Sequence, residues 1–258
     1  MFEIYLEQAR DTSFSGWDFS YITMNGRMIE TPKKWNYYNV VFPWLLKANT
    51  LLDMGTGGGE VLAGFTPLPP NTYATEQHKP NIPVARERLE PLGVKVVQID
   101  EKYMNNEVLP FEDQMFDLII NRHESFYPPE LMRILKPGGL FITQQVGQGL
   151  WNLKKALTGK EGIKSDWNLE TVVRGLESAG FQMLDAREDT QFIRLYDIGA
   201  IAYWLRAVPW IIEDITGVPD FTVEKYKDRL WELHLQIEKE GFYDCSHALF
   251  IIIANKSR

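Results

Sequence analysis

A glycine-rich segment directly after a short apolar run is the feature that most constrains this chain. Residues 50–60 read Thr-Leu-Leu-Asp-Met-Gly-Thr-Gly-Gly-Gly-Glu, with glycines at alternate positions after Asp53. This order predicts a buried strand, a tight turn and the first turn of a helix. Glycine permits positive φ and leaves room for a ligand against the main chain. We therefore expect a nucleoside-type cofactor at the carboxyl edge of the first strand of a sheet.

The glycine spacing narrows the choice of cofactor. The dinucleotide pattern G-x-G-x-x-G would need its third glycine at Glu60 or Leu62, so both reading frames fail. The phosphate-binding pattern G-x-x-x-x-G-K-[ST] is absent from the sequence as well. What remains is an acid-x-G-x-G-x-G order that starts at Asp53. A cofactor without phosphates tolerates acids beside such a loop.

Strands and helices alternate along most of the chain after this loop. Further strands are predicted at 72–76, 94–99, 116–121, 140–144, from 181 to 186, and at 248–254. Helices are predicted at 37–47, 81–89, 129–135 and 168–179. This alternation predicts right-handed crossovers and an α/β fold with a mostly parallel, doubly wound sheet.

Two regions depart from the alternation, within what we interpret as a single domain over 1–258. Residues 1–36 are rich in aromatic side chains and are predicted to form a partly helical N-terminal extension. A core at 37–190 is followed by a helical insertion at 191–241, with helices predicted at 198–207 and 223–240. The last strand belongs to a final segment, 242–258.

Composition restricts the classes of function. Of 258 residues, 45% are hydrophobic, which allows a substantial core. The net charge of −8 argues against a broad, sequence-independent grip on nucleic acid. The single cysteine, Cys245, excludes an internal disulfide and a cysteine-rich zinc site, and no metal is expected. Acids at the N-terminus and the lack of a long apolar run favour a cytoplasmic protein without a membrane partner.

Three further motifs carry a resemblance to a known family. They are the segments Leu-Pro-Phe-Glu-Asp at 109–113, Phe-Asp-Leu-Ile at 116–119 and Leu-Lys-Pro-Gly-Gly-Leu at 135–140. Together with the glycine loop they resemble the class I S-adenosylmethionine-dependent methyltransferases over about residues 45–145. The resemblance implies a Rossmann-like sheet of about seven strands whose last strand is antiparallel.

The resemblance also implies which residues contact S-adenosyl-L-methionine. These are Asp53, Gly55, Thr56, Gly57, Gly59, Glu76, Asp100, Glu101 and Asn121. Glu76 would bind the ribose hydroxyls, and Asp100 would accept a hydrogen bond from the adenine amino group, with Glu101 beside the ring. Glu76 could instead be a solvated acid, and Asp100 a helix N-cap.

Polar residues at the tip of the fourth core strand are the candidates for catalysis. Because ligands lie beyond the carboxyl ends of strands, the order Asn-Arg-His-Glu-Ser at 121–125 belongs at the site. His123 is the candidate general base, Glu124 could orient it or bind a substrate cation, and Arg122 could bind a carboxylate or phosphate. A loop that satisfies its own polar groups is the alternative. The [DN]-P-P-[YF] signature is absent, which argues against an adenine or glutamine-amide acceptor.

Further residues are candidates for the acceptor side. One of Gln144 and Gln145 is expected to face the pocket, since strand side chains alternate. An aromatic lid, or ordinary core packing, would use Trp17, Phe19, Tyr37, Tyr38, Tyr196, Tyr203 and Trp204. Trp35 is interpreted as an approach to a helix, and Lys33 with Lys34 as solvated charge.

These observations predict a methyltransferase that acts on an oxygen or nitrogen of a small molecule. An rRNA or tRNA methyltransferase is one alternative, with a positive face made of Arg133, Lys136, Lys154, Lys155, Lys160 and Lys164. A cofactor-binding regulator without catalysis is another, and the glycine spacing disfavours a nicotinamide oxidoreductase. The sequence predicts neither the acceptor nor the oligomeric state.

Overall fold

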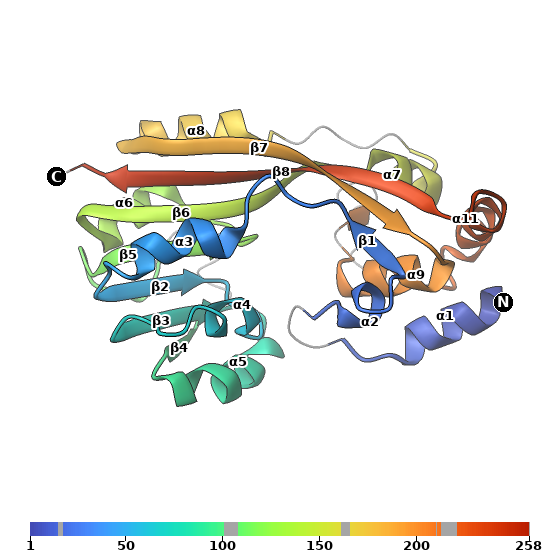
Figure 1. Cartoon of the computed structure of the whole chain (residues 1–258), viewed down its shortest axis with the longest axis horizontal. Helices are drawn as coiled ribbons and strands as arrows, with labels where there is room; N and C mark the ends of the chain where they lie inside the picture. Colours follow the sequence, from blue (N-terminus) through green and yellow to red (C-terminus); the bar gives the residue numbers. More distant parts are fainter. Residues whose placement is uncertain (15–17, 101–107, 161–165, 210, 213–220, 258) are drawn as a thin grey trace.

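The protein is built on a mixed sheet that runs through its whole length (Figure 1). The computed structural model describes residues 1–14, 18–100, 108–160, 166–209, 211–212 and 221–257. Its strands are β1 (Met28–Glu30), β2 (Thr50–Met54), β3 (Asn71–Glu76), β4 (Lys95–Gln98), β5 (Phe116–Arg122), β6 (Leu135–Gly149), β7 (Phe181–Leu195) and β8 (Tyr243–Lys256).

Helices lie on both faces of this sheet and at one end of it. They are α1 (Phe2–Asp11), α2 (Ser20–Thr23), α3 (Tyr37–Leu45), α4 (Glu60–Ala63), α5 (Asn81–Leu89), a 3₁₀ turn η1 (Glu90–Leu92), α6 (Pro128–Ile134), α7 (Trp151–Thr158), α8 (Leu169–Ser178), α9 (Ile198–Ala207) and α11 (Lys227–Glu240).

The strand order confirms the predicted α/β topology. The order is β1-β7-β8-β6-β5-β2-β3-β4, in which β4, β3, β2, β5 and β6 are mutually parallel. The last strand, β8, is antiparallel to both of its neighbours, β6 and β7. β1 adds an eighth strand that was not predicted, and it pairs antiparallel with β7. Its three residues are too few to show an alternating pattern.

Side-chain alternation along the strands gives the sheet two apolar faces. Leu51 and Leu118 belong to the core under α3, α4 and α5, whereas their neighbours Leu52 and Ile119 belong to the core under α6 and α8. All four side chains are at most 1% exposed. Strands buried on both faces read as continuous apolar runs, which is why the core strands were recognisable in the sequence.

β7 and β8 extend well beyond the other strands and join two halves of the molecule (Figure 1). The predicted sixth strand, 181–186, continues to Leu195, so the first residues of the predicted insertion are strand rather than insertion. Its helix at 198–207 is confirmed by α9, while α11 begins at Lys227, four residues later than predicted. The long ladder between β7 and β8 forms the base on which this second half is built.

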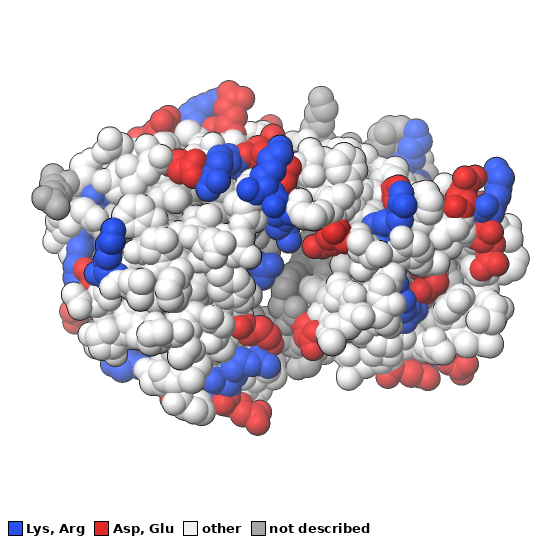
Figure 2. Space-filling view, viewed as in Figure 1, with Lys and Arg blue, Asp and Glu red and all other residues white. Residues whose placement is uncertain are grey.

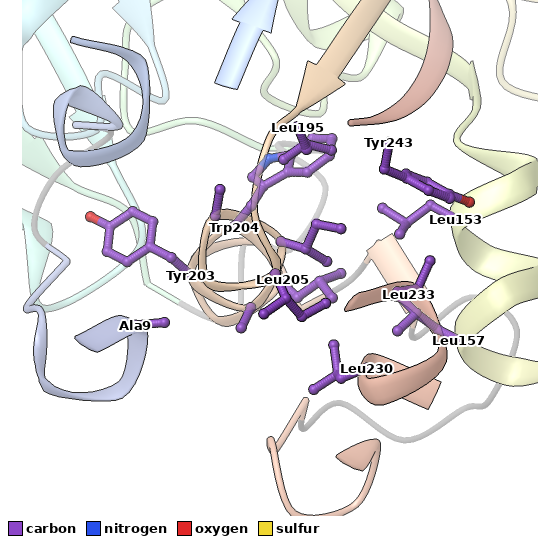
Figure 3. Packing of buried hydrophobic residues seen from close by; sticks show 14 of the residues in the cluster. Ala9, Leu153, Leu157, Leu195, Tyr203, Trp204, Leu205, Leu230, Leu233 and Tyr243 are labelled. Carbon is purple, nitrogen blue, oxygen red and sulfur yellow. The ribbon is translucent and has the colours of Figure 1, made fainter. Parts of the chain in front are cut away.

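The second half has a hydrophobic core of its own. Every residue of α9 except Arg206 is buried, as expected for a helix that is apolar on all sides. α9 packs among α1, α7 and α11, which contribute side chains such as Ala9, Leu153 and Leu230 (Figure 3). Tyr203 and Trp204 lie in this core, so they follow the packing alternative rather than the predicted lid.

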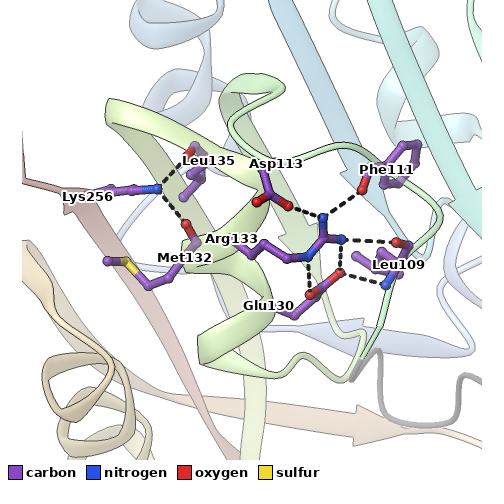
Figure 4. A network of polar contacts seen from close by, with 8 residues as sticks. All are labelled: Leu109, Phe111, Asp113, Glu130, Met132, Arg133, Leu135 and Lys256. Carbon is purple, nitrogen blue, oxygen red and sulfur yellow. Dashed lines mark hydrogen bonds and ion pairs between the residues drawn. The ribbon is translucent and has the colours of Figure 1, made fainter.

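The Leu-Pro-Phe-Glu-Asp segment is held by one ion-pair network, in which Glu130 is buried and Arg133 is partly exposed (Figure 4). Arg133 of α6 forms a bidentate pair with Glu130, at 2.8 and 2.5 Å. The same guanidinium donates to the carbonyl oxygens of Leu109 and Phe111 and to the Asp113 carboxylate. Glu130 in turn accepts from the Leu109 backbone N–H at 2.7 Å. The network fixes the loop that leads into β5, the strand that carries the polar tip.

Among the helices of the described residues, none is both long and apolar enough to cross a bilayer.

Candidate functional site

The glycine loop forms the turn predicted between β2 and α4. Gly55, Gly57 and Gly59 have φ values of 66°, 63° and 81°, in the left-handed region that favours glycine. The turn is anchored to β3, because the backbone N–H groups of Gly55 and Thr56 donate to the side chain and carbonyl of Thr75 at 3.2 and 2.8 Å. The main chain is therefore presented at the carboxyl edge of the sheet.

Glu76 lies at the end of β3 and faces the glycine loop. One carboxylate oxygen accepts from the Gly57 N–H and the other from the His78 N–H, both at 2.7 Å. Burial raises the pKa of this carboxyl above its ordinary value. These bonds fix both oxygens at the rim of a pocket of about 460 Å³, lined by Glu76, Gln77, His78, Lys79, Pro80 and Glu124.

Glu124 reaches this pocket from the other side, a contact that sequence spacing does not show. A Cβ atom placed on Gly55 would lie 2.6 Å from the Glu124 side chain. Glycine at position 55 is therefore required by φ and by the closeness of Glu124. The carboxylates of Glu76 and Glu124 also interact electrostatically, so the pocket has an acidic lining.

Asp53 lies beneath the loop, as the acid at the end of the first core strand. It is 6% exposed, and burial raises the pKa of its carboxyl to about 7, against the opposing effect of the nearby Arg122. Desolvation disfavours the charged form of an acid, so the cofactor-free protein holds this charge at a cost. A cation bound above the loop would lower that cost.

The two predicted adenine contacts, Asp100 and Glu101, are less well supported by the structure than the glycine loop and Glu76. Asp100 is exposed and follows the end of β4 by two residues. Its neighbour Ile99 is buried, and the Ile99 N–H donates to the Glu76 carbonyl at 2.9 Å, which keeps this segment beside the pocket. Glu101 lies outside the described residues.

Asn121, near the end of β5, is held in one orientation by its neighbours. Gln145 donates to the backbone carbonyl of Glu124 at 3.0 Å, so the Gln145 atom in that contact is its amide nitrogen. The same nitrogen donates to Asn121 Oδ1 at 2.7 Å, and the Thr143 hydroxyl donates to that oxygen at 3.1 Å. Asn121 Nδ2 thus points elsewhere, and it is a buried donor without a hydrogen-bond partner among the described residues. Such a donor indicates a ligand or water at this position.

His123 and Arg122 form the transition from strand to loop. His123 has a φ of 69° and donates its backbone N–H to the Gln144 carbonyl at 2.9 Å. Burial, together with the charges of Arg122, His247 and Lys33, lowers the pKa of His123 well below its usual value. The imidazole is therefore neutral at pH 7. Among the described residues, Arg122 has no salt-bridge partner.

Gln144 and Gln145 both contact the site, where only one was expected to do so. Gln144 accepts from the Trp35 indole N–H at 2.9 Å, and its amide nitrogen lies 3.5 Å from His123 Nε2. The Tyr37 hydroxyl donates to the Asn121 carbonyl at 3.4 Å. Trp35 is therefore buried and bonded at the site, a role that the sequence interpretation missed. Trp17 lies outside the described residues, and Tyr196 is 39% exposed.

The alternative of a positive face for RNA finds little support in the geometry. Arg133 and Lys136 are held in ion pairs with Glu130 and Asp117, and Lys154 is 8% exposed. Cys245 is buried, and burial raises the pKa of its thiol to about 12, so it is not an activated nucleophile.

Part of this chain resembles known methyltransferases. Residues 52–143 match the family described as "Methyltransferase domain". A "Ubiquinone biosynthesis O-methyltransferase" of Roseobacter denitrificans is 28% identical over 128 residues, 47% of this chain and 50% of that protein. A "Ubiquinone/menaquinone biosynthesis C-methyltransferase UbiE" of Pseudoalteromonas translucida is 31% identical over 120 residues, 42% of this chain and 47% of that protein. The chain thus spans about half the length of the curated relatives it matches.

A solved structure shares the architecture over most of the chain. A protein of Bacillus halodurans C-125, described as an inferred methyltransferase, superposes with a TM-score of 0.60 and 19% identity. The match covers 86% of this chain and 99% of that one, so it shows a common fold. Residues 52–143 of this chain are therefore a class I S-adenosylmethionine-dependent methyltransferase domain.

Proposed function

We propose that this protein transfers a methyl group from S-adenosylmethionine to an oxygen or nitrogen of a small-molecule acceptor. The observation that carries the proposal is the acidic pocket at the carboxyl edge, where Glu76 and Glu124 face the glycine loop from two sides. The relatives named for ubiquinone biosynthesis support a small-molecule acceptor, and the one named an O-methyltransferase supports an oxygen atom as its methylated site.

The residues at this edge fit such a cofactor. S-adenosylmethionine supplies an electrophilic methyl group on a positively charged sulfur. The three left-handed glycines shape the turn that would face a nucleoside, and Glu76 is positioned to accept from ribose hydroxyls. Asp53 and Glu124 add negative charge that favours a cationic ligand over a phosphate-bearing one. Asn121 Nδ2 offers a buried donor, and Thr56 of the loop has a buried hydroxyl without a partner among the described residues.

In methyl transfer the cofactor supplies the reactive group, so the main task of the protein is to align the reactants. The acceptor atom, the methyl carbon and the sulfur must be collinear and shielded from water. In the proposed arrangement, residues 37–190 and 242–258 hold the cofactor, and residues 1–36 with 191–241 cover the acceptor. Arg122, His123 and Glu124 lie at the junction of these parts and would position the acceptor.

The proposed function can be tested with a metabolite extract and a labelled methyl donor. We expect the wild-type protein to label a small molecule, and Gly57→Arg to abolish labelling because the arginine fills the cofactor site. His123→Ala should retain affinity for S-adenosylhomocysteine while labelling falls at least tenfold. Cofactor binding without labelled product in any extract would contradict the proposal and favour a regulator. Labelling confined to added RNA would favour an RNA methyltransferase.

A further inference from the structure

Charge is divided between the two sides of the site. Asp53, Glu76 and Glu124 lie on the side of the glycine loop, where a cationic cofactor would bind. On the basic side, Arg122 and Lys33 act electrostatically on His123, and Arg122 also acts on Asp53, so it lies where the two sides meet. The hollow between the two halves of the molecule is bordered by both kinds of charge (Figure 2). A cation and an anion could therefore bind side by side across the strand tip.

The basic side also contains unpartnered buried polar atoms. His123 Nδ1, His247 Nδ1 and Gln191 Oε1 are buried and lack a hydrogen-bond partner among the described residues. His247 of β8 lies directly opposite Gln191 of β7, so both belong to one row of the sheet. Gln191 is 1% exposed, and its amide nitrogen is already bound to Thr31. Buried polar atoms without partners are rare in native proteins and indicate a ligand or water.

The tautomer of His123 follows from the bonds around it. Trp35 can only donate, so the Gln144 atom bound to it is the amide oxygen, and Gln144 turns its NH₂ toward His123. His123 Nε2 then accepts, and the proton of the neutral ring lies on Nδ1. The unpartnered atom of His123 is thus an N–H donor. It suits an anionic oxygen better than the role of a general base.

Residues 31–35 are hydrogen-bonded to the strands beside this region, and this segment carries Lys33. The Thr31 N–H donates to the Phe192 carbonyl at 2.9 Å, the Lys34 N–H to Asp189 at 2.9 Å, and Trp35 to Gln144. These bonds tie the segment to β7 and β6. The side chain of Lys33 is 31% exposed and that of Lys34 is 70% exposed, so the first lysine is turned further into the protein than the second. Lys34 pairs with Asp189 at 3.1 Å, and its backbone N–H bonds the same carboxylate, whereas Lys33 forms a longer ion pair with Glu30 at 3.5 Å.

We propose that the methyl acceptor carries an anionic oxygen group, a carboxylate or a phosphate, which Arg122, Lys33 and the His123 Nδ1–H bind. This inference rests on the proposed function and specifies the acceptor of the same site. His247 and Gln191 extend the polar surface along the sheet and would contact a more distant part of the acceptor. An acceptor that is anionic at its binding group is oriented by charge, and an arginine with a lysine is the usual protein partner for such groups.

The first test separates acceptors by charge. A metabolite extract is passed over an anion exchanger at neutral pH, and each fraction is incubated with protein and labelled methyl donor. We expect the labelled product from the retained fraction, and a product only from the unretained fraction would overturn the inference. Phosphatase treatment of the retained fraction distinguishes the two groups, because it removes a phosphorylated acceptor and spares a carboxylate. Cofactor binding without product in any fraction would contradict the proposed function itself, and the inference with it.

The second test uses the two adjacent lysines as a matched pair, with the retained fraction as acceptor. Lys33→Gln is expected to raise the apparent KM about fivefold at unchanged kcat, since one charged contact to the acceptor is lost. Lys34→Gln should leave KM within about twofold of wild type, because its charge is paired with Asp189. Affinity for S-adenosylhomocysteine, measured by calorimetry, should be unchanged in both and reports on folding. Equal KM values for the two variants would overturn the role of Lys33.

Discussion

Asp53 shows how single residues at this site favour ligand binding at the expense of stability. Its carboxylate is buried under the glycine loop, and burial raises its pKa to about 7. The folded protein therefore binds this proton more tightly than the unfolded chain does. The stability of the cofactor-free protein falls as pH rises from the ordinary carboxyl pKa to about 7, and the loss is complete above that value.

Asp53→Asn should accordingly stabilise the cofactor-free protein and weaken cofactor binding. The stabilisation is expected to be about 2 kcal/mol larger at about pH 8 than at about pH 5.5, from 1.36 kcal/mol per pKa unit. Urea unfolding at the two pH values measures it, and calorimetry with S-adenosylhomocysteine measures the loss of affinity. A stabilisation that is the same at both pH values would show that the pKa of Asp53 is not raised in the folded protein.

Gly55→Ala tests the contact between the loop and Glu124. Alanine at φ 66° is strained, and its Cβ would collide with Glu124. Gly93→Ala is a matched control, since Gly93 has a φ of 81° and open space around its Cβ position. Gly93→Ala should lose about 1 kcal/mol of stability from backbone strain alone, and Gly55→Ala should lose more. Only Gly55→Ala should lose affinity for S-adenosylhomocysteine, by at least about tenfold, and an equal loss in Gly93→Ala would contradict the assignment of the loop.

The sequence revealed those site residues whose neighbours are close along the chain. The glycines, Asp53 and Glu76 follow a local pattern of strand, turn and strand end, and the structure places them together. Contacts between distant segments left no such pattern. Trp35 bonds to a glutamine 109 residues away, and was interpreted as a simple approach to a helix.

At the scale of elements, one buried ion pair helps to join the N-terminal segment to α9. Arg27 donates to both oxygens of Asp197 at 2.8 and 2.6 Å, and the Asp197 side chain also caps α9 by accepting from the Ala200 N–H at 2.9 Å. The two side chains are 15% and 10% exposed. Water therefore screens this pair poorly, and removal of one partner leaves a buried charge.

Asp197→Asn and Asp244→Asn form a matched comparison of a buried and an exposed pair. Asp244 also binds an arginine, Arg194, with two oxygens, but its side chain is 48% exposed. We expect Asp197→Asn to cost about 3 kcal/mol and Asp244→Asn at most about 1 kcal/mol in urea unfolding. Equal costs would show that α9 is not anchored through Arg27.

Element boundaries were predictable where burial was continuous or periodic. The core strands and α9 were recognised because whole runs of apolar residues are buried. The distal half of β7, with exposed residues such as Phe192 between buried ones, was assigned to the insertion. Its strand conformation is imposed by pairing with β8, which the chain reaches about fifty residues later.

At the scale of the whole molecule, one half carries the glycine loop and the other a separately packed helical core (Figure 1). β7 and β8 run through both halves, so in the proposed arrangement a continuous ladder ties the acceptor side to the cofactor side. The polar tip of β5 faces the junction of the two. This arrangement supports a site that is complete only where the halves meet.

The central claim is that the glycine loop belongs to an S-adenosylmethionine site, and calorimetry with two ligands tests it most directly. S-adenosylhomocysteine and NAD are titrated separately into the wild-type protein and into Gly57→Arg. We expect S-adenosylhomocysteine to bind to the wild type and not to Gly57→Arg, and we expect no binding of NAD. Binding of NAD to the wild type with no heat from S-adenosylhomocysteine would contradict the claim.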